Sequence, residues 1–245
     1  MHAKENIFEP MDSVLQSFTP ATDGWRPKWR SKRDPAVPGL IDNGEILDSP
    51  SPKGREYDEM FQLVQRLFLA PAPMSTKRVM FCGIDSNHSS HVCANAGRIL
   101  ARQTGATVCL VDANVQYGQL SRQFDLEQKD AIRGRLIPWR EQCAYVGKNL
   151  FVGRTGLLGG SEGRLASTNE IRDRILVLAS SFDYLLFDAP GANTSSDAAL
   201  LGQLVGSAVL VFEAKSTRKT EARRAKERLE TVNVRILGTV LNNYR

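Results

Sequence analysis

The sequence lacks any apolar run of about 18 residues, the length that a helix needs to span a bilayer. Its first ten residues contain no apolar core segment of the kind that a secretory signal requires. It has only four cysteines, at positions 82, 93, 109 and 143, and none of them forms a C-x-x-C pair. These absences predict a cytoplasmic chain whose cysteines are reduced core thiols.

Proline and charge are unevenly distributed along the chain. Residues 1–53 hold seven of the eleven prolines and show no sustained periodicity, so we predict a flexible tail there. Within it, residues 25–33 read WRPKWRSKR, which suits a membrane interface or a protein partner as well as a charged linker. Residues 215–228 carry seven Lys or Arg against two Glu. This stretch suits a solvated helix, an anionic membrane, a nucleic acid or an acidic protein.

The apolar pattern changes from one long helix to alternating strands and helices. Residues 55–69 show helical spacing, and Pro71 follows them. The apolar residues on one face of that helix are Met60, Phe61, Val64, Leu67 and Phe68. Beyond residue 77, the predicted strands are 79–82, 107–111, 150–152, 184–187, 208–212 and 235–241, and the predicted helices are 92–102, 170–180, 198–205 and 217–231. The alternation predicts an α/β domain over 54–245, a three-layer sandwich with a mostly parallel sheet.

A loop after the first predicted strand resembles a phosphate-binding loop. In parallel sheets, ligands bind beyond the carboxyl ends of the strands. Residues 83–90 read GIDSNHSS at such a place, and a phosphate loop reads G-x-x-x-x-G-K-[ST] between a strand and a helix. Gly83 and Ser90 match the first glycine and the final hydroxyl. His88 replaces the second glycine, and Ser89 replaces the lysine.

Two aspartates, Asp112 and Asp188, each follow a predicted apolar strand. Proteins hold Mg²⁺ through one or two carboxylates together with phosphate and water. A single aspartate at a strand end more commonly caps the next loop. Two of them beside a phosphate-loop-like turn favour a magnesium nucleotide site, which Ser90 and water would complete.

These motifs resemble the MinD/ParA-like P-loop superfamily, and most closely the bacterial tyrosine kinases of capsule and exopolysaccharide machinery, over about residues 55–243. The segment LVDAN around Asp112 resembles the family's L-I-D-A-D, and YLLFDAPG around Asp188 resembles Y-V-I-I-D-T-P-P. The VLN that ends at Asn242 resembles the family's last strand, and the helix with Glu59 resembles its oligomerisation helix, E-x-x-R-x-x-R. The resemblance implies a P-loop NTPase fold, Mg-ATP as cofactor, the two aspartates as catalytic and magnesium-binding residues, and Asn242 beside the base.

The sequence departs from this pattern at the groups that hold phosphate. Ser86 and His88 stand where the family's loop has glycine, and a side chain there obstructs a cradle of backbone N–H groups. Ser89 cannot supply the lysine's charge-assisted bond, which is worth roughly 1.5–3 kcal/mol. Gln62 and Gln65 replace two arginines of the oligomerisation helix. We therefore predict a degenerate member, weak or inactive in catalysis, whose helix N-terminus can bind an anion or nucleotide without hydrolysis. The predicted nucleotide-binding residues are Gly83, Ser86, His88, Ser89, Ser90 and Asn242.

The same loop allows a second interpretation. Asp85, His88 and His91 are spaced three apart at the start of a helix, where two imidazoles and a carboxylate could hold a metal ion. The sequence shows no fourth ligand. This favours a polar loop that caps the helix and leaves both imidazoles exposed.

Three functions are compatible with these patterns. The first is a non-catalytic regulator or scaffold in capsule, exopolysaccharide or holdfast-type polysaccharide synthesis and export. It would lie at the inner membrane and bind a membrane co-polymerase of the chain-length-determinant type through residues 55–70, with the basic surface as a candidate second contact. It could also form a homo-oligomer. The second is an active ATP-dependent protein-tyrosine kinase. The third is a ParA/MinD-like positioning ATPase that binds DNA or membrane through residues 215–228. The Glu59 helix and the segment 112–124 favour the first, so nucleic acid is the less favoured partner.

Overall fold

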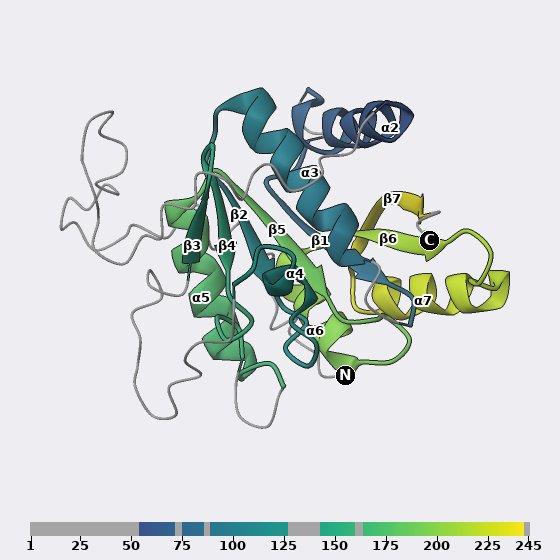
Figure 1. Cartoon of the computed structure of the whole chain (residues 1–245). Helices are drawn as coiled ribbons and strands as arrows, with labels where there is room; N and C mark the ends of the chain where they lie inside the picture. Colours follow the sequence, from purple (N-terminus) through teal and green to yellow (C-terminus); the bar gives the residue numbers. More distant parts are fainter. Residues whose placement is uncertain (1–53, 72–74, 86–88, 127–142, 160–163, 243–245) are drawn as a thin grey trace, which may run out of the picture.

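The strands of the computed structural model lie close to those predicted (Figure 1). The structure describes residues 54–71, 75–85, 89–126, 143–159 and 164–242. Its strands are β1 (Arg78–Gly83), β2 (Val108–Asp112), β3 (Cys143–Gly147), β4 (Leu150–Gly153), β5 (Tyr184–Ala189), β6 (Ser207–Glu213) and β7 (Arg235–Asn242). Within these residues, they form one sheet in the order β3-β4-β2-β5-β1-β6-β7, and all neighbours are parallel except β3 and β4. The predicted α/β fold with a mostly parallel sheet is confirmed.

Strand β3 is the one strand that the sequence pattern missed. It pairs antiparallel with β4 through a short turn at Lys148 and Asn149, both of which have positive φ angles of 48° and 61°. Its five residues, CAYVG, are mostly half-buried at the edge of the sheet and therefore form no continuous apolar run. The central strands β1 and β2 are instead buried at every position, because helices cover both of their faces.

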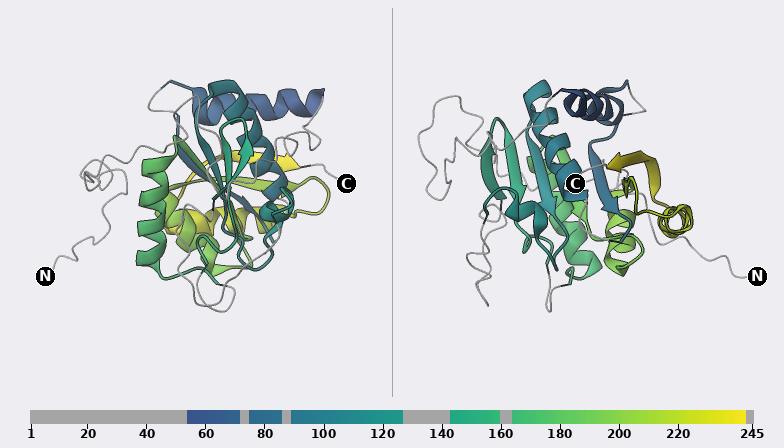
Figure 2. Two further views of the ribbon diagram at one scale, coloured as in Figure 1. Left: turned by 60° about the vertical axis from the view of Figure 1, so that its left-hand side comes forward. Right: turned by 45° about the vertical axis from the view of Figure 1, so that its right-hand side comes forward.

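The helices form a layer on each face of the sheet (Figure 2). They are α2 (Arg55–Val64), η3 (Gln65–Leu69), α3 (Ser89–Thr104), α4 (Gln119–Arg122), α5 (Thr168–Ser181), α6 (Ser196–Val205) and α7 (Lys219–Thr231). The buried residues of α5, α6 and α7 belong to the core on one face, and those of α2, α3 and α4 belong to the core on the other. This arrangement is the predicted three-layer sandwich.

The helix predicted over 55–69 is α-helical only to Val64. It continues as the π-helical turn η3, in which the consecutive residues Leu67 and Phe68 are both buried. The wider turn lets both apolar side chains face the core, and Phe68 packs edge-on against Tyr184 with ring centroids 5.7 Å apart. The helix thereby lies against the outer side of α3, with Met60 buried beneath it.

Helix α3 is buried along most of its length, because it lies between the sheet and α2. Gly97 allows it to approach β2 closely, since a Cβ atom there would lie 2.4 Å from Leu110 Cδ2. This close packing positions the first turn of α3 at the carboxyl ends of β1 and β5.

The cysteines are free thiols, as predicted. Three of them are buried, and burial together with the charge of Asp188 raises the pKa of Cys82 to about 12. Among the described residues, no helix is long and apolar enough to cross a membrane. The predicted tail, residues 1–53, lies outside the described residues.

Candidate functional site

Asp112 and Asp188 lie side by side at the carboxyl ends of two central strands. Asp112 is the last residue of β2, and it pairs in register with Asp188 of the adjacent parallel strand β5. Both side chains are fully buried. Neighbouring strands are about 4.8 Å apart, and residues in register point to the same face of a sheet, so the two carboxyl groups share one small region.

Two hydroxyl groups from the first turn of α3 bind Asp188. Ser89 Oγ donates to Asp188 Oδ1 at 2.8 Å, and Ser90 Oγ donates to Asp188 Oδ2 at 2.5 Å. Both serines are fully buried. The side chain at the lysine position of the loop pattern, Ser89, therefore points into the sheet and binds a carboxylate.

Asp112 is held by a second group of hydroxyls. Its Oδ2 accepts hydrogen bonds from the backbone N–H of Ser121 at 2.8 Å, from Ser121 Oγ at 2.7 Å and from Thr155 Oγ1 at 3.2 Å. Ser121 lies in α4, and the residue before this helix, its N-cap Gly118, has a φ of 56°. A Cβ atom at Gly118 would lie 2.8 Å from Thr155 Oγ1, so glycine permits this close approach.

The other oxygen of Asp112 has no such contact. Asp112 Oδ1 is buried, and within the described part of the chain it has no hydrogen-bond partner. A buried carboxylate oxygen is costly to leave without a partner, so the atom marks a position where a cation or water would be stabilised. This oxygen, Asp188 and the Ser90 hydroxyl are the hard oxygen donors that Mg²⁺ prefers, and we find that the set fits a divalent cation.

The electrostatics of the site follow from burial and like charge. Burial and then the negative charge of Asp112 raise the pKa of Asp188 to about 7, although the hydroxyls of Ser90 and Ser89 oppose the shift. Burial also raises the pKa of Asp112, against the hydrogen bonds from Ser121 and Thr155. The pair therefore favours either protonation of Asp188 or a bound cation.

The loop after β5 fixes the start of the phosphate-loop-like segment. The backbone N–H of Ala192 donates to Gly83 O at 2.9 Å, and Thr194 Oγ1 donates to Asp85 O at 3.2 Å. Gly191 allows this contact, because a Cβ atom there would lie 2.8 Å from the Asp85 carbonyl carbon. Of the predicted nucleotide-binding residues, Ser86 and His88 lie outside the described residues, and Asn242 ends β7, two strands away from β1.

The segment that follows Asp112 packs against α3. Phe124 is fully buried, and the guanidinium of Arg98 lies 4.5 Å from the centre of its ring. Arg98 Nη1 also donates to Asn95 Oδ1 at 3.1 Å. The apolar positions of the 112–124 motif thus serve packing, and they hold α4 and its Ser121 beside Asp112.

The histidine interpretation of the loop is not tested by these contacts. His91 Nε2 lies 2.9 Å from Asn95 Nδ2 and 3.6 Å from Glu56 Oε1 of α2. No group of three His, Cys, Asp or Glu side chains that could hold a metal occurs where the chain is described, and His88 is outside that part.

Several known proteins with similar sequences are bacterial tyrosine kinases. No family model matches the chain. Tyrosine-protein kinase YwqD of Bacillus subtilis is 25% identical over 205 residues, which cover 82% of this chain and 86% of that kinase. Tyrosine-protein kinase CpsD of Streptococcus pneumoniae is 30% identical over 95 residues, which are 39% of this chain and 42% of CpsD, so this match spans less than half of that relative. By sequence, the chain is therefore similar to bacterial tyrosine kinases.

Several solved structures superpose on this chain and share its fold. The chimerical protein CapA2B2 superposes with a TM-score of 0.68 at 18% identity, over 84% of this chain and 92% of that one. The cell division ATPase MinD of Pyrococcus furiosus superposes with a TM-score of 0.53 at 21% identity, over 69% of this chain and 73% of MinD. The chain therefore shares the mostly parallel α/β fold of these two proteins.

The sequence pattern did not identify two residues of the site. Ser121 and Thr155 bind Asp112, and their hydroxyl groups lie 3.1 Å from each other. Thr155 lies just beyond the carboxyl end of β4. Because this strand was predicted from the sequence, its position could have marked Thr155 as a candidate site residue. Ser121 had a weaker signal, because serine within a short polar helix is common on any surface. The roles of the predicted site residues in nucleotide binding stay predictions.

Proposed function

We propose that this chain is a catalytically silent or weak member of its family, and that it acts as a scaffold or regulator in capsule or exopolysaccharide production. The observation that carries the proposal is the contact of Ser89 with Asp188. Phosphoryl transfer relies on cations that stabilise the negative charge of the moving group. A buried serine bonded to a carboxylate supplies no positive charge at the position that the loop pattern gives to lysine.

Nucleotide binding is compatible with this proposal. Asp112 Oδ1, Asp188 and the Ser90 hydroxyl would hold the magnesium ion, which would neutralise part of the phosphate charge when a nucleotide is bound. Ser89 and Ser90 would keep Asp188 oriented by their two hydrogen bonds. We therefore expect weak binding of Mg-ADP or Mg-ATP with little or no turnover.

The partner that we propose is an inner-membrane polysaccharide co-polymerase, bound through α2. The inner side of this helix is buried through Met60 and Val64. Glu59, Gln62 and Gln65 are exposed on the outer side, where they are available to a partner or to a second copy of the chain. The CapA2B2 likeness and the kinase relatives support this assignment at the level of the family.

Incubation of the purified wild-type chain with Mg-ATP tests catalysis. We expect no phosphotyrosine, and ATP turnover no higher than that of the Asp112→Ala variant. Phosphotyrosine that forms in the wild type and disappears in Asp112→Ala would instead establish the alternative, an active tyrosine kinase.

A gain-of-function pair tests the cause. His88→Gly combined with Ser89→Lys is expected to strengthen Mg-ADP binding in calorimetry at least about tenfold, because a charge-assisted bond contributes roughly 1.5–3 kcal/mol. Ser89→Ala removes the same hydroxyl without adding a charge, so it should produce no gain. Equal affinities for the two variants would contradict the role that we give to the missing cation.

Co-purification tests the scaffold role. The tagged chain, co-expressed with the polysaccharide co-polymerase of its own organism, is expected to retain that protein through detergent extraction. Glu59→Arg should weaken retention, whereas Asp173→Arg, an equal charge change on the exposed side of α5, should not. Retention that is unchanged by Glu59→Arg would remove α2 as the binding surface.

A further inference from the structure

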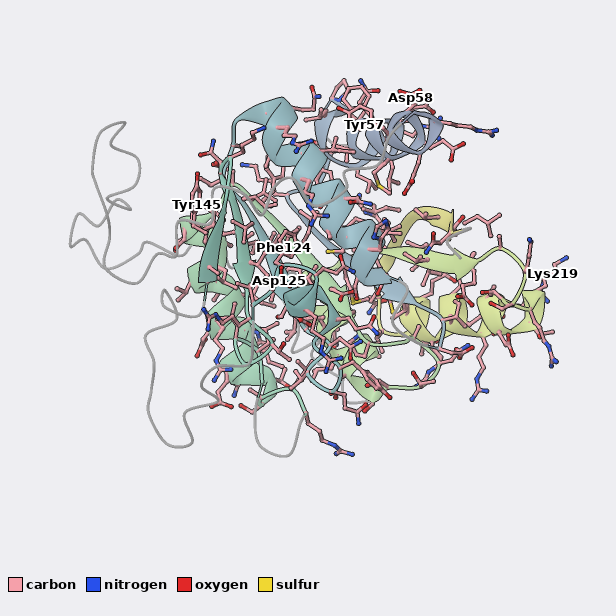
Figure 3. All side chains as sticks on the ribbon, in the orientation of Figure 1. Tyr57, Asp58, Phe124, Asp125, Tyr145 and Lys219 are labelled. Carbon is pink, nitrogen blue, oxygen red and sulfur yellow. The ribbon has the colours of Figure 1, made fainter. Side chains whose placement is uncertain are left out.

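Helix α7 has a strongly basic end at the surface of the domain. Within residues 215–224, the five cations are exposed, and they are Lys215, Arg218, Lys219, Arg223 and Arg224. Glu221 is the one acidic residue of this stretch, and its carboxylate accepts a hydrogen bond from the backbone N–H of Arg218 at 3.1 Å. Figure 3 shows Lys219 at the outer end of the helix, pointing away from the body of the domain. We call these five cations the basic end of α7.

The remaining charges of α7 are used within the domain or balanced along the helix. Arg228 is half-buried and donates to Asn193 O at 2.7 Å. Lys226 pairs with Glu230 at 2.8 Å. Arg223 and Arg224 have no ion-pair partner among the residues that the structure describes. Ala225 and Leu229 attach the other side of the helix to the core. The exposed positive charge is concentrated in the N-terminal half of the helix and in the residues just before it.

We propose that the basic end of α7 binds the anionic headgroups of a membrane surface. This inference rests on the proposed function, which puts the domain beneath a membrane. Each cation held near an anionic bilayer strengthens binding roughly fivefold, so five of them suffice for peripheral attachment.

Two features favour lipid over nucleic acid. No aromatic residue occurs in 215–231, so α7 offers no platform on which single-stranded bases could stack. Glu227 and Glu230 are exposed on the second half of the helix, and a duplex groove that enclosed the whole helix would bring them against phosphates. A planar anionic surface can contact the basic end alone.

Vesicle sedimentation of the full chain tests the proposal. The wild type is expected to bind vesicles that contain phosphatidylglycerol and phosphatidylcholine, and to dissociate from them at high salt. It is expected not to bind vesicles of phosphatidylcholine alone. Arg223→Glu with Arg224→Glu should weaken binding about 25-fold or more, from two lost contributions of roughly fivefold each. The control, Lys148→Glu with Arg164→Glu, makes the same change in net charge at exposed positions elsewhere and should retain binding.

Three results would overturn the proposal. They are absence of wild-type binding to anionic vesicles, equal losses in the two double variants, and tighter binding to duplex DNA that only the α7 variant loses. Both variants change exposed side chains, and an unaltered thermal unfolding curve confirms that they fold. Vesicle binding is measured without ATP and without the co-polymerase, so its failure is separate from failure of the proposed scaffold function.

Discussion

Replacing Asp188 with asparagine is expected to stabilise the chain at neutral and alkaline pH. The wild-type carboxyl group is fully buried beside Asp112, and its pKa in the folded protein is raised to about 7. Asparagine has nearly the same shape. Its amide can accept a hydrogen bond from one of the serines Ser89 and Ser90 and donate to the other, because a hydroxyl group both donates and accepts.

The sign and size of the effect follow from proton linkage. In the unfolded chain the carboxyl group ionises near its ordinary pKa of 3.8, whereas in the folded chain it keeps its proton to about pH 7. Between these values the folded state binds more protons, so the free energy of unfolding falls as the pH rises, by about 1.4 kcal/mol per pH unit. The loss is complete above pH 7, where it amounts to at most about 4 kcal/mol. Asp188→Asn removes it.

Thermal unfolding from pH 5 to pH 8, with EDTA to exclude divalent cations, measures this difference. The melting temperature of Asp188→Asn should rise relative to wild type with increasing pH, by roughly 2–4 °C for each kcal/mol in a domain of this size. Asp173→Asn, on the exposed side of α5, is the matched control and should show no such trend. A stability difference that does not depend on pH, or a variant less stable than wild type at pH 8, would refute the reasoning.

Other substitutions test the packing and the hydrogen bonds around the site. Gly97→Ala should destabilise the domain by about 1–3 kcal/mol in urea unfolding, although alanine normally favours a helix, because its Cβ atom would meet Leu110 at 2.4 Å. Ser121→Ala removes a hydroxyl donor from buried Asp112 and should cost about 1–3 kcal/mol, a loss that shrinks when Asp112→Asn is combined with it. Ser167→Ala should cost about 1 kcal/mol by removing the cap of α5, and an unchanged unfolding midpoint would show that this cap contributes nothing.

Much of the secondary structure could be predicted from the sequence, because central strands and long helices have strong local patterns. The runs at 79–82 and 107–111 predicted β1 and β2 to within one residue at every end. Strand β3 was not predicted, since an edge strand buries too little of its length to require a continuous apolar run. The π-helical turn at Leu67 and Phe68 was not predicted either, because it depends on how both side chains pack into the core.

The sequence by itself determined which residues stand at the ends of strands. It gave a carboxylate to β2 and to β5, two serines to the start of α3, and no lysine to the loop before that helix. Strand order, which arises from contacts between distant segments, decided that Asp112 and Asp188 are neighbours. The tertiary structure also decided that Ser89 turns inward to Asp188, because close packing of α3 against the sheet leaves a small hydroxyl beside a buried carboxylate that needs a donor.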